Sequence, residues 1–110
     1  MYKIMVIDDE PIILNGVCNY LISAGSELDL DIYKSKNAFE AIRMMQKYKM
    51  DIVLTDIRMP GMSGLELQQK VLEYWPRCKV IFLTGYDDFN YVHNAIRNGA
   101  QDYIMKTEGY

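Results

Sequence analysis

Residues 51–61 read Asp-Ile-Val-Leu-Thr-Asp-Ile-Arg-Met-Pro-Gly, and this stretch decides the fold. Its apolar and β-branched run is too short for a helix and is closed by a Pro-Gly turn signal, so it predicts a strand buried on both faces. The strand ends in a carboxylate, Asp56. In an open parallel sheet the carboxyl ends of the strands border the crevice where ligands bind. Asp56 is therefore placed for chemistry.

Outward from this stretch, short apolar runs alternate with segments of helical periodicity. The other predicted strands cover residues 3–7, 30–33, 79–83 and 103–105, and the predicted helices cover residues 11–24, 37–48, 63–75 and 87–98. The run 30–33 is the more polar, as expected of a sheet edge. The order βαβαβαβαβ predicts an α/β domain: a doubly wound, five-stranded parallel sheet flanked by helices, with right-handed crossovers.

Capping residues and periodicity set the expected helix ends and inner faces. Pro11 suits a first helical turn, and Asn37 with Glu40 and Ser63 with Glu66 form capping pairs. The side chains that we expect to face the core are Ile13, Val17, Tyr20 and Leu21 in the first helix, Ala38, Ile42 and Met45 in the second, and Leu67, Val71 and Tyr74 in the third.

Composition narrows the class of protein. A chain of 110 residues, half of them hydrophobic, is expected to form one domain with one core. A formal net charge of -3 with scattered Lys and Arg argues against a broad surface for nucleic acid or anionic membrane. The sequence contains no signal peptide or spanning segment, so we expect a cytoplasmic location. Cys18 and Cys78 are far apart and are expected to be reduced structural thiols.

Polar residues end most of the predicted strands: Asp8 and Asp9, Asp56, Thr84 and Lys106. In a parallel sheet these ends meet in one crevice, where three carboxylates repel one another unless a cation lies among them. Mg²⁺ suits such a site because it takes oxygen ligands and is commonly held by one or two carboxylates plus a phosphate. Lys106 adds a charge suited to a phosphoryl oxygen and Thr84 a hydroxyl. Such a pocket can accept a phosphoryl group on a carboxylate.

Four motifs together resemble the receiver domain of two-component response regulators. They are Val-Ile-Asp-Asp-Glu-Pro at 6–11, Leu-Thr-Asp-Ile-Arg-Met-Pro-Gly-Met-Ser-Gly at 54–64, Leu-Thr-Gly-Tyr-Asp-Asp-Phe at 83–89 and Asp-Tyr-Ile-Met-Lys at 102–106. The resemblance covers the chain from end to end. It implies a flavodoxin-like sheet of order 2-1-3-4-5.

The resemblance also implies a role for each matching residue. Asp56 is the expected phosphoacceptor, Asp9 a direct Mg²⁺ ligand, Asp8 a residue acting mainly through a metal-bound water, Arg58 a ligand through its backbone carbonyl, Lys106 a phosphoryl-binding residue, and Thr84 with Tyr103 the switch pair. The expected partner is a sensor histidine kinase. The resemblance implies that the domain assists its own phosphorylation and dephosphorylation, and it is not expected to be an enzyme in the ordinary sense.

Phosphorylation is expected to move Thr84 inward and to change the face formed by the fourth helix and fifth strand. Residues 85–92 and 98–103 resemble receivers joined to an AraC-type helix-turn-helix output domain. DNA binding and transcription regulation would therefore act through an output domain that is not in this chain.

The chain departs from the receiver pattern near its end. Thr107 stands where Pro is usual, and only four residues follow Lys106, so the helix that normally covers the last strand is missing. We expect residues 1–110 to be a receiver domain truncated at its C-terminus. As a hypothesis, the uncovered flank of the fourth helix and last strand forms a homodimer or binds a partner's helix.

Other interpretations stay open. The domain could be a stand-alone receiver or a phosphorylation-independent interaction module, which failure to form a beryllofluoride complex would favour. A Mg²⁺-dependent phosphohydrolase would need a second nucleophile-motif Asp and a substrate cap, which the sequence lacks. A flavodoxin-like cofactor binder is disfavoured because the acidic loop after the first strand repels phosphate.

Overall fold

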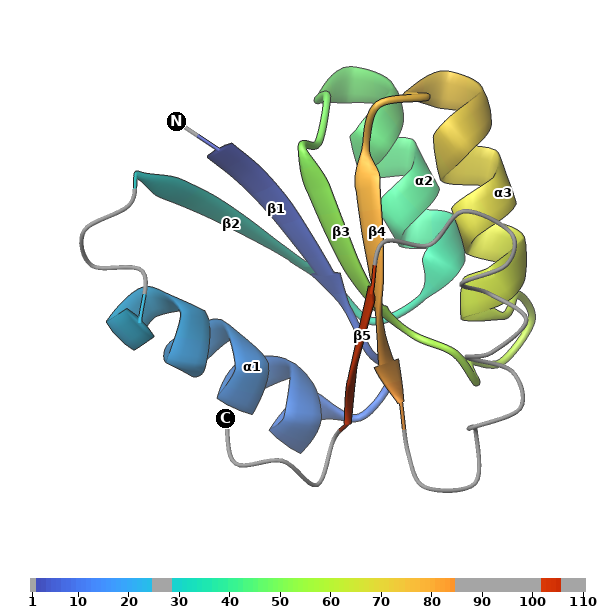
Figure 1. Cartoon of the computed structure of the whole chain (residues 1–110). Coiled ribbons are helices and arrows are strands. Elements are labelled where there is room, and N and C mark those ends of the chain that lie inside the picture. The colour runs from blue at the N-terminus through green and yellow to red at the C-terminus, as the bar shows by residue number, and fades with distance from the viewer. Residues whose placement is uncertain (1, 25–28, 85–101, 106–110) are drawn as a thin grey trace.

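From β1 to β4, strands and helices alternate along the chain as the sequence predicts. The computed structural model describes residues 2–24, 29–84 and 102–105 (Figure 1). The strands are β1 (Tyr2–Ile7), β2 (Leu30–Ser35), β3 (Ile52–Asp56), β4 (Lys79–Thr84) and β5 (Asp102–Met105), and the helices are α1 (Pro11–Ala24), α2 (Ala38–Lys47) and α3 (Gly64–Tyr74). The predicted helix at 87–98 lies outside the described residues. Within the described ranges, no helix combines the length and the apolar character needed to cross a membrane.

The five strands form one parallel sheet in the order β2-β1-β3-β4-β5, which confirms the predicted order. The register brings the carboxyl ends of the central strands level: Ile7 pairs with Thr55, and Asp56 pairs with Leu83. Thr84 pairs in turn with Met105. The carboxyl ends of β1, β3 and β4 therefore lie at one edge of the sheet.

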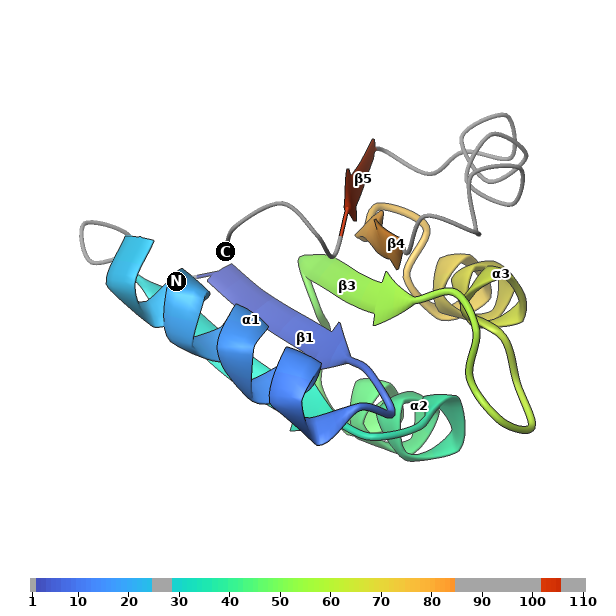
Figure 2. The same ribbon diagram turned by 90° about the horizontal axis from the view of Figure 1, so that it is seen from below.

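The sheet separates two layers of helix, with α1 on one face and α2 and α3 on the other (Figures 1 and 2). Alternate residues of each central strand serve the two layers, because side chains in a strand point to opposite faces. Met5, Ile7 and Val53 belong to the cluster beneath α2 and α3. Val6 and Leu54 belong to the cluster beneath α1. The central strands are thus buried on both faces, as predicted.

Two tyrosines predicted to face the core do not. Tyr20 is 49% exposed and Tyr74 is 45% exposed. In α1 the buried positions beside Val17 are Leu14 and Cys18. Tyr74 lies at the rim between α2 and α3, where its hydroxyl accepts a hydrogen bond from the Gln46 side chain at 3.1 Å. A phenol can cover apolar surface while its hydroxyl stays solvated, so helical spacing alone misplaced both rings.

The predicted helix caps are present. The side chain of Asn37 accepts a hydrogen bond from the Glu40 backbone at 2.8 Å and begins α2. Ser63 and Glu66 form a complete capping box at the start of α3. At the end of α3, Trp75 is the cap residue, and its indole N–H donates to the Met45 carbonyl at 2.9 Å. The Trp75 bond thus joins the end of α3 to α2.

Replacing Ser63 with Ala should lower the free energy of unfolding by about 1 kcal/mol, because the orphan N–H of Glu66 loses its acceptor. Urea unfolding followed by circular dichroism measures this loss. Ser23→Ala is the control, since Ser23 is exposed in the last turn of α1. Equal stability of the two variants would show that the box contributes nothing.

Cys18 and Cys78 are free, as predicted, and both are buried. Burial, with a smaller contribution from the charge of Asp51, raises the pKa of the Cys78 thiol to about 12. Burial also raises the pKa of Cys18, against an opposing effect of the Lys34 charge. Both thiols are therefore protonated at neutral pH and act as small apolar core residues.

Candidate functional site

Four carboxylates gather at the carboxyl ends of β1 and β3. One carboxylate oxygen from each of Asp8, Asp9, Glu10 and Asp56 lies within 4.8 Å of the others. Asp8 is completely buried and Asp56 is 3% exposed, while Asp9 and Glu10 are exposed. We call these four residues the carboxylate cluster. It has a buried floor and a solvent-facing rim.

The ends of the two strands fix the buried members of the cluster. Asp8 follows β1 directly, and its Oδ1 accepts a hydrogen bond from the Glu10 backbone at 2.9 Å. Asp56 is the last residue of β3, and its Oδ1 accepts from the Ile57 backbone at 2.8 Å. Each carboxylate is thus oriented by a backbone N–H just beyond its strand. An Asp at a strand end makes this turn naturally, because its side chain reaches the backbone one or two residues on.

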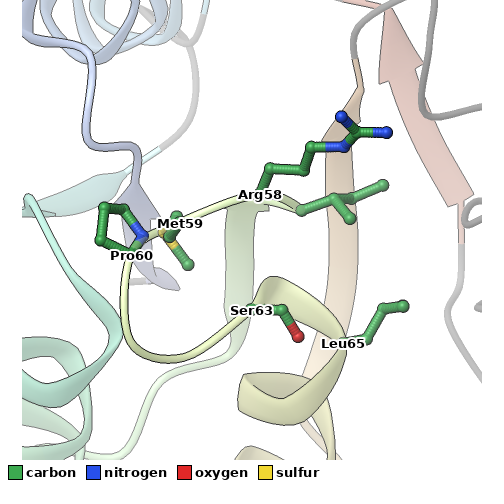
Figure 3. A pocket seen from close by; sticks show the side chains of 6 residues that line it. Arg58, Met59, Pro60, Ser63 and Leu65 are labelled. Carbon is green, nitrogen blue, oxygen red and sulfur yellow. The ribbon is translucent and has the colours of Figure 1, made fainter.

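Residues 57–63 connect β3 to α3, and we call them the β3–α3 loop. Gly61 has a φ of +84°, a backbone conformation that residues other than glycine rarely adopt. The loop closes through the Gly64 N–H, which donates to the Ile57 carbonyl at 2.7 Å. Met59 is buried in the core cluster, whereas Arg58 is exposed. Figure 3 shows the Arg58 side chain extended away from Pro60.

A hollow of about 560 Å³ lies along this loop. It is lined by Ile57, Arg58, Met59, Pro60, Ser63 and Leu65 (Figure 3). Its walls are mainly apolar, and the carboxylate cluster contributes none of them. The chemistry of the site therefore belongs to the cluster, and this hollow is a feature of the loop beside it.

The donor set of the cluster suits a hard divalent cation. Carboxylate oxygens are the ligands that Mg²⁺ prefers, and four negative charges in so small a volume repel one another. Because Asp8 and Asp56 are buried, water screens that repulsion poorly. A bound cation would relieve it, so the residues present fit the predicted metal.

The structure brings together three of the predicted site residues, Asp8, Asp9 and Asp56. Arg58 follows in the β3–α3 loop. Thr84 ends β4 one residue beyond the partner of Asp56, and Tyr103 lies on β5 opposite Phe82. Lys106 lies outside the described residues.

Sequence reasoning missed Glu10 as a member of the cluster. The signal was present, because Glu10 is the third acid of the run Asp8-Asp9-Glu10. An acid directly before Pro11 also fits the start of a helix, where acids are commonly found. The turn in which the Glu10 N–H donates to Asp8 brings its carboxylate back toward Asp56.

Comparison with known proteins gives a consistent result. The model of the response regulator receiver domain family matches residues 4–109. The transcriptional regulatory protein YesN of Bacillus subtilis (strain 168) is 40% identical over 108 residues, which cover 96% of this chain and 28% of YesN. The transcriptional regulatory protein HptR of Staphylococcus aureus (strain NCTC 8325 / PS 47) is 36% identical over 106 residues, which cover 96% of this chain and 41% of HptR. The chain thus spans less than half the length of these relatives.

Solved structures agree. A two component transcriptional regulator AraC from Clostridium phytofermentans ISDg superposes with a TM-score of 0.81 at 34% identity, covering 96% of this chain and 81% of that one. The REC domain of AraT, a response regulator from Geobacillus stearothermophilus, superposes with a TM-score of 0.84 at 31% identity, with the same coverage. The fold, the sequence motifs and the sequence similarity are therefore in agreement.

Proposed function

Since this chain belongs to the response regulator receiver domain family, we propose that it accepts a phosphoryl group from a sensor histidine kinase on Asp56. The observation that carries the proposal is the carboxylate cluster, which lies at the carboxyl edge of the sheet with Asp56 in its buried floor. In the transfer, an Asp56 carboxylate oxygen forms a bond to phosphorus as the P–N bond of the phosphohistidine breaks. The imidazole leaves with the electron pair of that bond.

Asp8, Asp9, Asp56 and the backbone carbonyl of Arg58 are the proposed Mg²⁺ ligands, with Asp8 acting mainly through water. When bound, Mg²⁺ would neutralise charge on the carboxylates and on the phosphoryl oxygens. The Ile57 N–H bond to Asp56 Oδ1 holds the carboxylate in one orientation. Positioning and charge neutralisation are what phosphoryl transfer chiefly requires.

Lys106, Thr84 and Tyr103 are proposed to respond to the phosphoryl group. Lys106 pairs with its charge and the Thr84 hydroxyl donates a hydrogen bond to it, while Tyr103 turns into the space that Thr84 leaves. The register supports this, since Thr84 pairs with Met105, the residue before Lys106. This switch would change what the face around β5 binds.

The proposed output is transcription regulation through a DNA-binding domain outside this chain. The support is that YesN and HptR are transcriptional regulatory proteins in which the matching region is 28% and 41% of the length. A cytoplasmic location belongs to the same proposal, because a regulator of this kind acts where its kinase and its DNA are found. A homodimer through the flank of the fourth helix and last strand is also proposed.

Incubation with acetyl phosphate and Mg²⁺, followed by intact mass spectrometry and peptide mapping, tests the proposal. We expect the wild-type chain to gain one phosphoryl group, and Asp56→Asn to gain none. Asp51→Asn is the matched control: Asp51 precedes the same strand at its other end, where its carboxylate accepts from the Lys3 backbone at 2.8 Å. It should be labelled as the wild type is. Labelling of Asp56→Asn at the wild-type rate would remove Asp56 from this role.

A further inference from the structure

Phe39 is a large apolar side chain that α2 leaves 47% exposed. Its ring lies on the backbone of Gly61 in the β3–α3 loop: a methyl group built on Gly61 would come within 2.8 Å of Phe39 Cε2 and 3.4 Å of Cζ. An exposed aromatic ring on a helix is thus explained by a contact with the loop that follows Asp56. The contact joins two segments that are far apart in the sequence.

The start of α2 is itself tied to the end of β1. The Ser35 carbonyl accepts a hydrogen bond from the Asp8 N–H at 3.2 Å. The Ser35 hydroxyl, which is buried, donates to the Asn37 carbonyl at 2.7 Å. Asn37 then caps the helix that carries Phe39. Residues 35–39, which we call the β2–α2 corner, therefore link the backbone of Asp8 to the β3–α3 loop.

The loop depends on such contacts because it has no helix or strand of its own at residues 57–63. Met59 anchors it from the core side. Phe39 contacts it at Gly61, the glycine with the left-handed conformation. Gly61 lies three residues after Arg58. Movement of the loop at Gly61 would therefore shift the Arg58 backbone relative to the carboxylate cluster.

We propose that the β2–α2 corner is a positioning element that holds the β3–α3 loop through the Phe39 ring and so sets the place of the Arg58 carbonyl beside the carboxylate cluster. The loop-holding role stands on the contacts alone, and the consequence for Mg²⁺ rests on the proposed function. Phe39 touches no reacting atom in this scheme. It acts through the loop, as residues that orient metal ligands commonly do.

The first test uses the metal-free chain. In Phe39→Ala, exchange of the two hydrogen-bonded amides at the end of the loop, those of Ser63 and Gly64, should quicken by about five-fold in NMR measurements, while the central strands keep their protection. Phe39→Leu should restore most of the protection, because a branched side chain still covers Gly61. Ile22→Ala is the control: Ile22 is 62% exposed on α1, across the sheet from α2, and its loss should leave the loop unchanged (Figure 1).

The second test is a Mg²⁺ titration followed by the backbone chemical shifts of Asp8 and Asp56. Phe39→Ala should raise the dissociation constant by about three- to ten-fold, with Phe39→Leu near the wild type. Unchanged loop exchange in Phe39→Ala, or faster exchange spread evenly over the strands, would overturn the positioning role. If instead the wild-type chain binds no Mg²⁺ while the loop responds as expected, the proposed function fails and the loop-holding role stands.

Discussion

Replacing Gly64 with Ala should lower the rate of phosphorylation by about 100-fold and the free energy of unfolding by at least about 3 kcal/mol. A Cβ on Gly64 would overlap the backbone carbonyl oxygen of Asp56 and would lie 3.0 Å from the Ile57 Cα. These atoms are backbone at the end of β3, so no rotamer change can relieve the clash. The start of α3 or the end of β3 must move instead.

Either movement harms the site. The Gly64 N–H bond to the Ile57 carbonyl would lengthen, and the Ile57 N–H orients the Asp56 carboxylate. A displacement of about 1 Å at a reacting group can lower a rate by about 100-fold. Urea unfolding measures the stability, and acetyl phosphate labelling measures the rate.

Gly16→Ala is the matched control, because it makes the same chemical change but is expected to shift the free energy of unfolding in the opposite direction. A Cβ on Gly16 would meet nothing within 4 Å, and Gly16 lies within α1. Alanine there should raise the free energy of unfolding by about 0.5 to 1 kcal/mol, since it reduces the freedom of the unfolded chain. If the two variants shift stability alike, the close approach of Gly64 to Asp56 is not what limits that position.

The strands and their parallel pairing could be predicted because each rests on a local signal, whereas the strand order was expected only from the resemblance to receiver domains. Buried strands appear as short apolar runs, and the helices between them require parallel pairing. β2 extends two residues beyond the predicted Tyr33, to Ser35. Lys34 and Ser35 are polar, so composition hides that they continue the ladder with Val6 and Ile7.

What could not be predicted depends on contacts between distant segments. The inward positions in the helices were ambiguous because Tyr20 and Tyr74 fit the spacing as well as Leu14 or Gln68, and only packing against the sheet decides between them. The contact of Phe39 with Gly61, which is 22 residues further along the chain, depends on the position of α2 relative to the β3–α3 loop. For Lys106 and the fourth helix, which lie outside the described residues, the sequence predictions stand as predictions.

Asp8→Asn should stabilise the metal-free chain and weaken its response to Mg²⁺. Without a cation, removing one charge from the carboxylate cluster relieves repulsion at a completely buried position, so the free energy of unfolding should rise by about 1 to 2 kcal/mol. Asparagine keeps an Oδ1 that can accept from the Glu10 N–H, so the turn is preserved. Thermal unfolding in a chelating buffer measures the gain.

Added Mg²⁺ should reverse this difference and make the wild-type chain more stable than Asp8→Asn. A ligand that binds only the folded state stabilises it by about 2.7 kcal/mol at one hundred times its dissociation constant. Each tenfold loss of affinity in Asp8→Asn removes about 1.4 kcal/mol of that gain. Asp29→Asn removes the same charge at an exposed position outside the cluster and should change neither quantity.

This reversal of relative stability on adding Mg²⁺ distinguishes a metal site from an acidic helix start. If Asp8 served only to orient the turn before α1, Asn would be neutral or destabilising, and Mg²⁺ would shift both proteins alike. In a metal site, the repulsion among the carboxylates both destabilises the metal-free chain and attracts the cation. Asp8→Asn reduces that repulsion, so it should raise the stability of the metal-free chain and lower its affinity for Mg²⁺. A single pair of unfolding curves, with and without Mg²⁺, therefore tests why an acid is buried at the end of β1.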